Sequence, residues 1–171
     1  MVVIEDELEG KLETELSGWK HIAVLGIGNE LNSDDGLGLL AAKELKKALA
    51  GVAGVKVFVT GSCPENFTGL VRRLSPTHVL LLDAVEMGER AGAIKLIDYK
   101  EIEEVMPSTH TLPLYMLAKY VEQEIGSKVS ILGVQPKNLD FGTGLSTEVE
   151  NSVGKLVLLV KQIIVPLEKC E

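Results

Sequence analysis

Short apolar runs rich in β-branched residues alternate with helical patterns along this chain, and this alternation constrains its fold more than any other feature. Five such runs predict strands near residues 21–27, 55–60, 78–83, 92–98 and 128–134. Apolar side chains recur at helical spacing in residues 36–50, 67–74, 113–125 and 147–165. Strands that alternate with helices favour a parallel sheet covered on both faces. We therefore predict an α/β fold: a three-layer αβα sandwich with a five-stranded, twisted, mostly parallel sheet.

Two details of the sheet are also predicted. Only a short turn, EMGERA, separates the run at 92–98 from the run before it, so this strand is expected to be antiparallel. The strands at 21–27 and 78–83 are expected to be neighbours, as in doubly wound sheets. Two pairs, Ser62 with Glu65 and Thr147 with Glu150, have the spacing of capping boxes.

The length of 171 residues fits one domain over residues 1–171. Residues 1–18 stand apart as an acidic segment, expected to form an amphipathic helical extension laid on that domain. A formal net charge of −8 argues against a nucleic-acid partner. Since no apolar stretch reaches membrane-spanning length and the start is acidic, no membrane partner is expected, and the protein is predicted to be cytoplasmic. Two cysteines are too few for a disulfide framework.

The segment GIGNELNSDDGLG, residues 26–38, follows the first predicted strand and looks like a dinucleotide-binding turn. Leu31 stands where the third glycine of that fingerprint belongs, and Gly36 comes five residues too late. Asp34 and Asp35 would also repel phosphates at the helix N-terminus. No Gly-Lys-Ser/Thr follows, so a P-loop fails as well. The simplest alternative is that Asp34 caps the helix while Asp35 favours its positive end.

Two more residues point to chemistry at the same edge of the sheet. Asp83 closes the apolar run VLLLD, where a carboxylate is costly to desolvate without a partner, although it could also serve the next turn. His110, in STHTLPL, follows a connector long enough to reach the rim that holds Asp35 and Asp83. His21 and His78 open strands and are expected at the opposite edge.

Asp35, Asp83 and His110 together would supply two carboxylates and one imidazole. This set suits a divalent first-row metal with open coordination positions, nickel or zinc before calcium. We predict that these three side chains converge and serve as both metal-binding and catalytic residues. Cys63 has no basic neighbour in sequence and is expected to be inert. Residues 133–146, GVQPKNLDFGTGLS, are expected to form a substrate-binding loop with Gln135 as its best polar candidate. Met106 and Met116 are expected to fill the core.

Three segments resemble the signature motifs of the hydrogenase maturation endopeptidases, in matching order and spacing: LGIGNELNSDDGLG, LLLDAVEMG and STHTLPL. Two others, PENFTGLVRRLSPTHVLLLDA and ILGVQP, resemble the branch that serves formate-hydrogenlyase (hydrogenase-3) type [NiFe] hydrogenases. The resemblance runs from about Ile22 to Val165. It implies an endopeptidase that removes a C-terminal peptide from a [NiFe] hydrogenase large-subunit precursor once nickel has been inserted.

The resemblance also implies which residues form the functional site. The metal-site positions of the family fall on Asp35, Asp83 and His110, although some relatives carry the longer Glu at the position of Asp35. The implied partner is the large-subunit precursor, and the implied metal is nickel recognised in that precursor, with another divalent metal able to replace it in isolation. A monomer is the default for a small domain that acts on a large partner.

Two mechanisms remain open at this point. In one, the metal polarises the scissile carbonyl and lowers the pKa of an attacking water. In the other, the carboxylates activate water directly and nickel is only a recognition element. Absence of the HExxH motif favours the second.

Two functional alternatives also need to be weighed. A nickel-binding assembly checkpoint protein that does not cleave would need the same three residues. A peptidyl-tRNA hydrolase shares the strand followed by GxGN, but its Pro-Gly continuation and its Thr-Arg-His-Asn segment are missing here. An acidic chain is also a poor tRNA binder.

Overall fold

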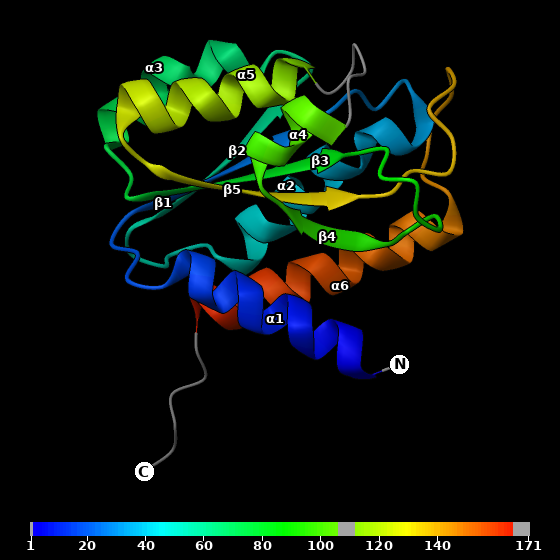
Figure 1. Ribbon diagram of the computed structural model, residues 1–171, viewed down its shortest axis with the longest axis horizontal. Coiled ribbons are helices and arrows are strands. Elements are labelled where there is room, and N and C mark those ends of the chain that lie inside the picture. The colour runs from blue at the N-terminus through cyan, green and yellow to red at the C-terminus, as the bar shows by residue number, and fades with distance from the viewer. Residues whose placement is uncertain (1, 106–111, 166–171) are drawn as a thin grey trace.

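The computed structural model describes residues 2–105 and 112–165 (Figure 1). The five strands are β1 Ile22–Ile27, β2 Val55–Gly61, β3 His78–Ala84, β4 Ile94–Ile97 and β5 Lys128–Val134. The α-helices are α1 Val2–Leu16, α2 Leu37–Ala48, α3 Thr68–Leu74, α4 Tyr99–Val105, α5 Leu112–Tyr120 and α6 Thr147–Ile164. Short helical segments precede or extend three of them: η1 Ser33–Gly36 before α2, η2 Pro64–Phe67 before α3, and the π-helical η3 Val121–Ile125 after α5.

The strands form one sheet in the order β2-β1-β3-β5-β4. Neighbouring strands are parallel from β2 to β5, and β4 alone runs antiparallel to its partner. The predicted antiparallel strand and the predicted contact between β1 and β3 are therefore both confirmed. The antiparallel strand does not pair with β3, which precedes it in the chain; β5 lies between them. All four parallel strands consequently end at the same edge, which we call the carboxyl edge.

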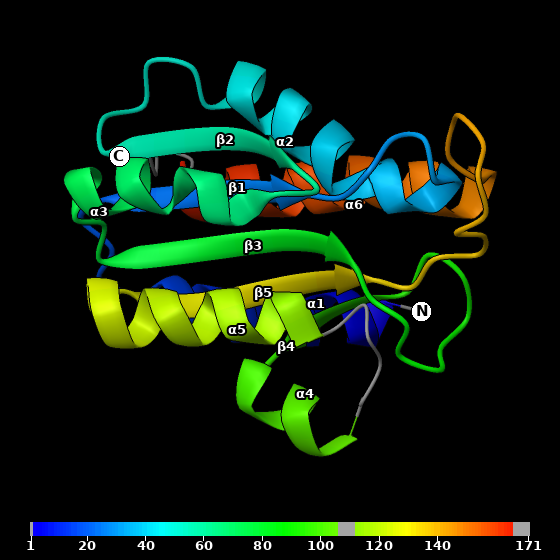
Figure 2. The ribbon, with the colours of Figure 1, turned by 90° about the horizontal axis from the view of Figure 1, so that it is seen from above.

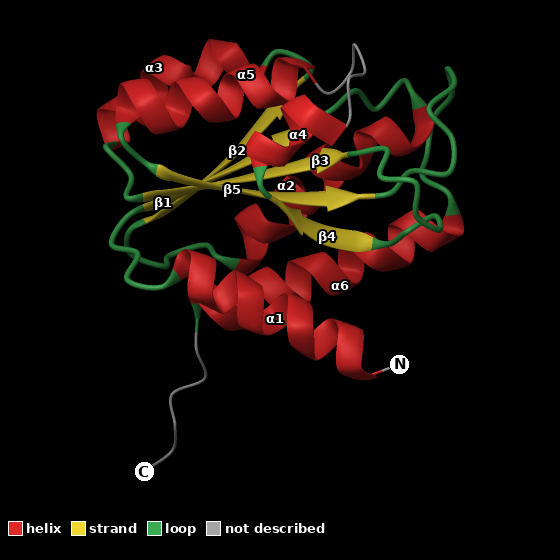
Figure 3. Ribbon diagram, in the orientation of Figure 1, coloured by secondary structure: helices red, strands yellow, loops and turns green. Residues whose placement is uncertain are grey.

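Helices cover both faces of the sheet, as Figures 2 and 3 show. Helices α1, α2 and α6 share one core with strand residues such as Val24, Leu80 and Leu132. Helices α3, α4 and α5 share the other core with residues such as Leu25 and Leu81. Successive strand residues point to opposite faces, so a strand buried on both sides needs a continuous apolar run. The predicted three-layer α/β fold is confirmed.

The N-terminal segment forms α1, which lies beside α6 in Figure 1 and buries Leu12 and Leu16. Treating this helix as an extension of a single 1–171 domain stays a prediction. Across residues 2–105 and 112–165, no helix combines the length and apolar character needed to span a membrane.

The predicted start of helix α6 agrees with the structure, but the predicted capping residues do not. Helix α6 begins at Thr147 as expected, but its N-cap is Ser146, and no side chain caps it. The predicted pair of Ser62 and Glu65 fails similarly, because η2 begins after Cys63 without a side-chain cap. Both predicted capping boxes are therefore wrong.

Candidate active site

The turn after β1 is shaped by close contact between helix α2 and the ends of two strands. A Cβ atom on Gly38 would lie 2.2 Å from the carbonyl oxygen of Ile27 and 2.4 Å from that of Leu82. A Cβ on Gly26 would lie 2.2 Å from the carbonyl oxygen of Gly38. Only glycine fits at such distances. The glycine that packs helix against strand is thus Gly38, and the first turn of α2 lies directly over the carboxyl ends of β1 and β3.

Asp35 lies in η1, inside the turn formed by the Gly-Asn pair that follows β1. The Asn29 backbone N–H donates to Oδ2 of Asp35 at 2.9 Å, and the Asn29 side chain accepts from the Leu31 N–H at 3.0 Å. Gly28 has φ +140°, and a Cβ there would lie 1.8 Å from the carbonyl oxygen of Asp35. The backbone therefore wraps tightly around Asp35 and fixes its partly buried carboxylate at the carboxyl edge.

Asp83 occupies the next-to-last position of β3, the strand beside β1. Its Oδ1 accepts the Ala84 backbone N–H at 2.8 Å. Removal from water, followed by repulsion from the Asp35 carboxylate, raises the pKa of Asp83 to about 8, although the Ala84 N–H opposes the shift. The structure thus places Asp83 close enough to Asp35 for the two carboxylates to repel each other.

His110 lies outside the described residues, so its meeting with the two aspartates stays a prediction. Helix α5, which begins at Leu112, runs opposite to β5 and has its first turn toward the carboxyl edge (Figure 2). No three His, Cys, Asp or Glu side chains in residues 2–105 and 112–165 are placed to share a metal ion.

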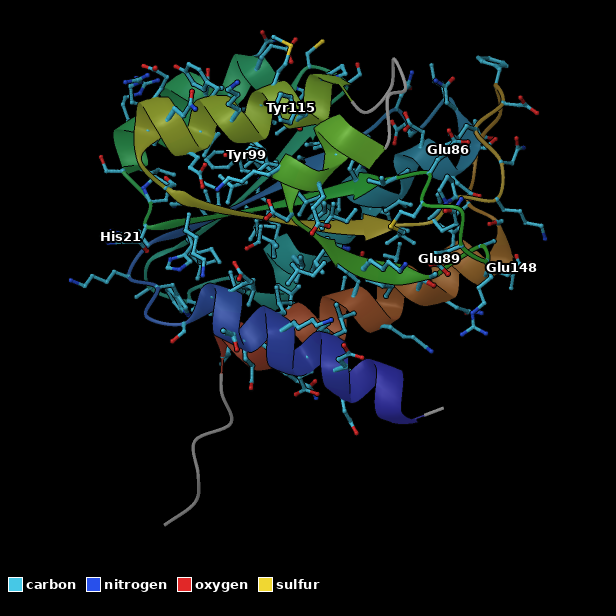
Figure 4. All side chains as sticks on the ribbon, viewed as in Figure 1. His21, Glu86, Glu89, Tyr99, Tyr115 and Glu148 are labelled. Atoms are coloured by element: carbon cyan, nitrogen blue, oxygen red, sulfur yellow. The ribbon has the colours of Figure 1, made fainter. Side chains whose placement is uncertain are left out.

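The other two histidines lie away from this site. His21 is at the opposite end of the sheet from Glu86, Glu89 and Glu148 (Figure 4). His78 begins β3, its Nδ1 lies 3.0 Å from the Thr77 hydroxyl, and burial together with nearby Lys128 lowers its pKa. The predicted place of both histidines at the opposite edge of the sheet is therefore confirmed.

Asp34 has a role that the sequence did not predict. Its side chain is fully buried and caps no helix. Its carboxylate accepts hydrogen bonds from the backbone N–H groups of Lys137, Asn138 and Ser146 at 2.8, 3.0 and 2.7 Å, and from the Ser146 hydroxyl at 3.0 Å. Burial alone would raise the pKa of Asp34, but these four donors outweigh it and hold the pKa below its usual value. The expectation that Asp34 is a helix cap is wrong.

Residues 137–146, which we call the clamp loop, are bonded to the turn before Asp35 by backbone contacts as well. The Ser33 N–H donates to the Gly142 carbonyl at 2.9 Å, and the Gly142 N–H donates to the Leu31 carbonyl at 2.8 Å. The Ser33 hydroxyl donates to the Asp140 carbonyl at 2.9 Å, and Ser33 adopts φ +53°. The two aspartates therefore divide the work: Asp34 fixes the clamp loop, and Asp35 stands at the candidate site. The two aspartates differ in role because residues about a hundred positions later in the chain, such as Lys137 and Ser146, bind Asp34 and not Asp35.

Gln135, which the sequence suggested as a polar substrate contact, is hydrogen-bonded within the protein, and its contact with substrate stays a prediction. Its Oε1 accepts the backbone N–H groups of Met87 and Glu89 at 2.6 and 3.2 Å, and its Nε2 donates to the Pro136 carbonyl at 3.2 Å. It holds the turn between β3 and β4 in place. Met116 is 61% exposed, so its predicted place in the core is wrong. Met106 lies outside the described residues.

Cys63 is exposed, and its sulfur lies 4.0 Å from the Ser62 hydroxyl. A serine hydroxyl is no base for a thiol, so this contact gives no support to a cysteine nucleophile.

The fold and the site together define a class of protein. A doubly wound sheet with two mutually repelling carboxyl groups at its carboxyl edge suits a protein that binds a cation or activates water. The turn after β1 does not suit a phosphate, because it carries these acidic side chains.

Comparison with known proteins agrees. Residues 39–163 match the model of the hydrogenase maturation protease family. The hydrogenase 3 maturation protease of Escherichia coli K12 is 37% identical over 131 residues, which cover 76% of this chain and 82% of that protein. A Methanocaldococcus jannaschii protein described as a hydrogenase maturation protease is 36% identical over 160 residues, which cover 90% of this chain and 94% of that protein.

Solved structures give the same result. The crystal structure of a [NiFe] hydrogenase maturation protease from Thermococcus kodakarensis superposes with a TM-score of 0.83 at 30% identity, covering 90% of this chain and 98% of that one. The chain belongs to the hydrogenase maturation protease family and is therefore an endopeptidase, a hydrolase that acts on peptide bonds. The peptidyl-tRNA hydrolase alternative is thereby set aside.

Proposed function

We propose that this endopeptidase removes the C-terminal extension of a [NiFe] hydrogenase large-subunit precursor after nickel has been inserted. Asp35, Asp83 and His110 meet the nickel that the precursor carries and assist cleavage of the peptide bond beside it. The observation that carries the proposal is the pairing of Asp35 with Asp83, at the edge where open α/β sheets bind their ligands. Membership of the maturation protease family supplies the substrate class.

The electrostatics of the pair support a cation as the recognised group. Each carboxyl group raises the cost of ionising the other, and a divalent cation between them removes that cost. An anionic ligand such as a phosphate would add a further repulsion. Carboxylate and imidazole ligands suit nickel, so the donors of Asp35, Asp83 and His110 fit the metal of the substrate.

Cleavage follows from the same groups. Nickel is part of the substrate here, and its binding marks the precursor as ready. Asp35, held by the Asn29 N–H, then acts as the base that takes a proton from the attacking water. Asp35 then gives this proton to the leaving amine, while Asp83, whose raised pKa falls when the cation arrives, is ionised and contacts the nickel.

Processing of the precursor tests this proposal. Nickel-loaded large-subunit precursor incubated with the protein should yield a large subunit that migrates faster in gel electrophoresis. Casein should stay intact, because it lacks the metal that the proposed site recognises. A stable complex without a shortened product would favour the non-cleaving checkpoint alternative. Rapid digestion of casein would contradict recognition through nickel.

A further inference from the structure

Two large apolar side chains stand in solvent on the segments that frame Asp35. Leu31 is 50% exposed and Phe141 is 86% exposed. Their segments are joined, because the Gly142 N–H donates to the Leu31 carbonyl at 2.8 Å and Asn32 forms a parallel bridge with Gly142. We call Leu31 and Phe141 the rim platform.

The exposure of Phe141 is fixed by the fold. The clamp loop that carries it is bonded to the buried Asp34 carboxylate at Lys137 and Asn138 on one side and at Ser146 on the other. Between these anchors, the carbonyl oxygens of Asp140 and Gly142 accept hydrogen bonds from Ser33. These hydrogen bonds hold the backbone of the loop at both ends and next to Phe141, with the phenyl ring in solvent. A single exposed leucine is ordinary, but an exposed phenyl ring on a segment hydrogen-bonded to that of a second exposed apolar side chain points to a contact surface.

The rim platform is continuous with the site where the substrate peptide is cleaved. Leu31 lies four residues before Asp35, and its N–H is bonded to Asn29, whose own N–H holds the Asp35 carboxylate. A polypeptide whose scissile bond lies at Asp35 and Asp83 can leave the carboxyl edge past these segments. The contact surface is therefore placed to receive the substrate itself.

We propose that the rim platform of Leu31 and Phe141 binds an apolar side chain of the large-subunit precursor beside the scissile bond. This inference rests on the proposed function and adds a determinant of specificity to nickel recognition. An apolar contact that does not touch the reacting atoms is equally strong in the bound substrate and in the transition state. The rim platform consequently lowers KM and leaves kcat unchanged.

Serine substitutions on the rim platform test the proposal. Phe141→Ser and Leu31→Ser should each raise KM for the nickel-loaded precursor about tenfold at unchanged kcat. Phe141→Leu should recover most of the loss. Leu158→Ser on α6 is the matched control, because Leu158 is 56% exposed at a position well along a helix that begins at the carboxyl edge, and it should leave KM unchanged. Thermal midpoints of all variants should match the parent, since the replaced side chains are exposed.

The outcomes separate this inference from the proposed function. If the parent protein cleaves the precursor and both platform variants do so with parental KM, the rim platform is refuted while the proposed function stands. If the parent protein fails to cleave, the proposed function falls, and a titration of the precursor by fluorescence anisotropy still decides the platform. A weaker Kd for Phe141→Ser and a parental Kd for Leu158→Ser would then support it, and equal Kd values would overturn it. A lower kcat at parental KM would also overturn it.

Discussion

Replacing Asp83 with asparagine should make the metal-free protein more stable at alkaline pH. The folded protein removes this carboxyl group from water and places it next to Asp35, so its charged form is disfavoured. Asparagine has nearly the same shape as the neutral acid and never ionises. The variant therefore avoids a charge that the parent protein must accommodate when the pH is high.

The size of the effect follows from the shift in the pKa of Asp83 from its usual value of 3.8 to about 8. Because the pKa is raised on folding, the stabilising contribution of Asp83 is complete below pH 3.8 and is lost as the pH rises toward about 8. A rise from 3.8 to about 8, at about 1.36 kcal/mol for each pH unit, sets an upper limit of about 6 kcal/mol. The side chain is only partly buried, so solvent screening reduces this limit, and we expect about 2–3 kcal/mol.

Urea unfolding followed by circular dichroism, in the presence of a chelator, measures this difference. The free energies of unfolding of Asp83→Asn and the parent should be similar near pH 4 and should diverge by about 2–3 kcal/mol in favour of the variant at pH 9. Asp6→Asn on α1 is the control, because Asp6 is exposed and far along the chain from the site. If the difference between Asp83→Asn and the parent did not change with pH, the proposed repulsion between Asp83 and Asp35 would be refuted.

Two further changes test how the site is supported. Asp34→Asn should lower the free energy of unfolding by about 2–3 kcal/mol, because an amide cannot accept all four hydrogen bonds that this carboxylate receives, whereas exposed Asp140→Asn should have little effect. Gly38→Ala should cost about 3 kcal/mol or more, because its methyl group would meet backbone carbonyl oxygens. The methyl group of Gly154→Ala would meet open space, so this control should leave the free energy of unfolding unchanged or raise it. Denaturant titration measures each difference, and an Asp34→Asn protein as stable as its parent would contradict the assignment of Asp34 to the clamp loop.

Most of the fold could be predicted because its signals are local. The ends of the five strands lie within two residues of their predicted ends, and the short turn after Ala84 was enough to predict that β4 is antiparallel. Its partner could not be predicted, because the insertion of β5 beside β3 depends on how α4 and α5 pack. Asp35 and Asp83 could be placed at one edge because both follow parallel strands whose ends must coincide.

What could not be predicted depends on contacts between distant segments. Asp34 and Asp35 are adjacent acids in the sequence, and only the clamp loop, about a hundred residues later, shows that Asp34 is a buried anchor. Gln135 follows a strand end as a substrate contact would, but its amide holds the turn at Met87 and Glu89. The capping box predicted at Thr147 is wrong for the same reason, since the N-cap of α6 is Ser146 and its hydroxyl donates to the distant Asp34.

The most direct test of the account is the intact mass of the large-subunit precursor after incubation with the protein. We compare nickel-loaded and nickel-free precursor, each treated with the parent protein and with Asp35→Asn. The account predicts a shortened large subunit and a released C-terminal peptide only for nickel-loaded precursor with the parent protein. Equal cleavage of nickel-free precursor, or full activity of Asp35→Asn, would contradict the claim that this carboxylate pair recognises the nickel and cuts beside it.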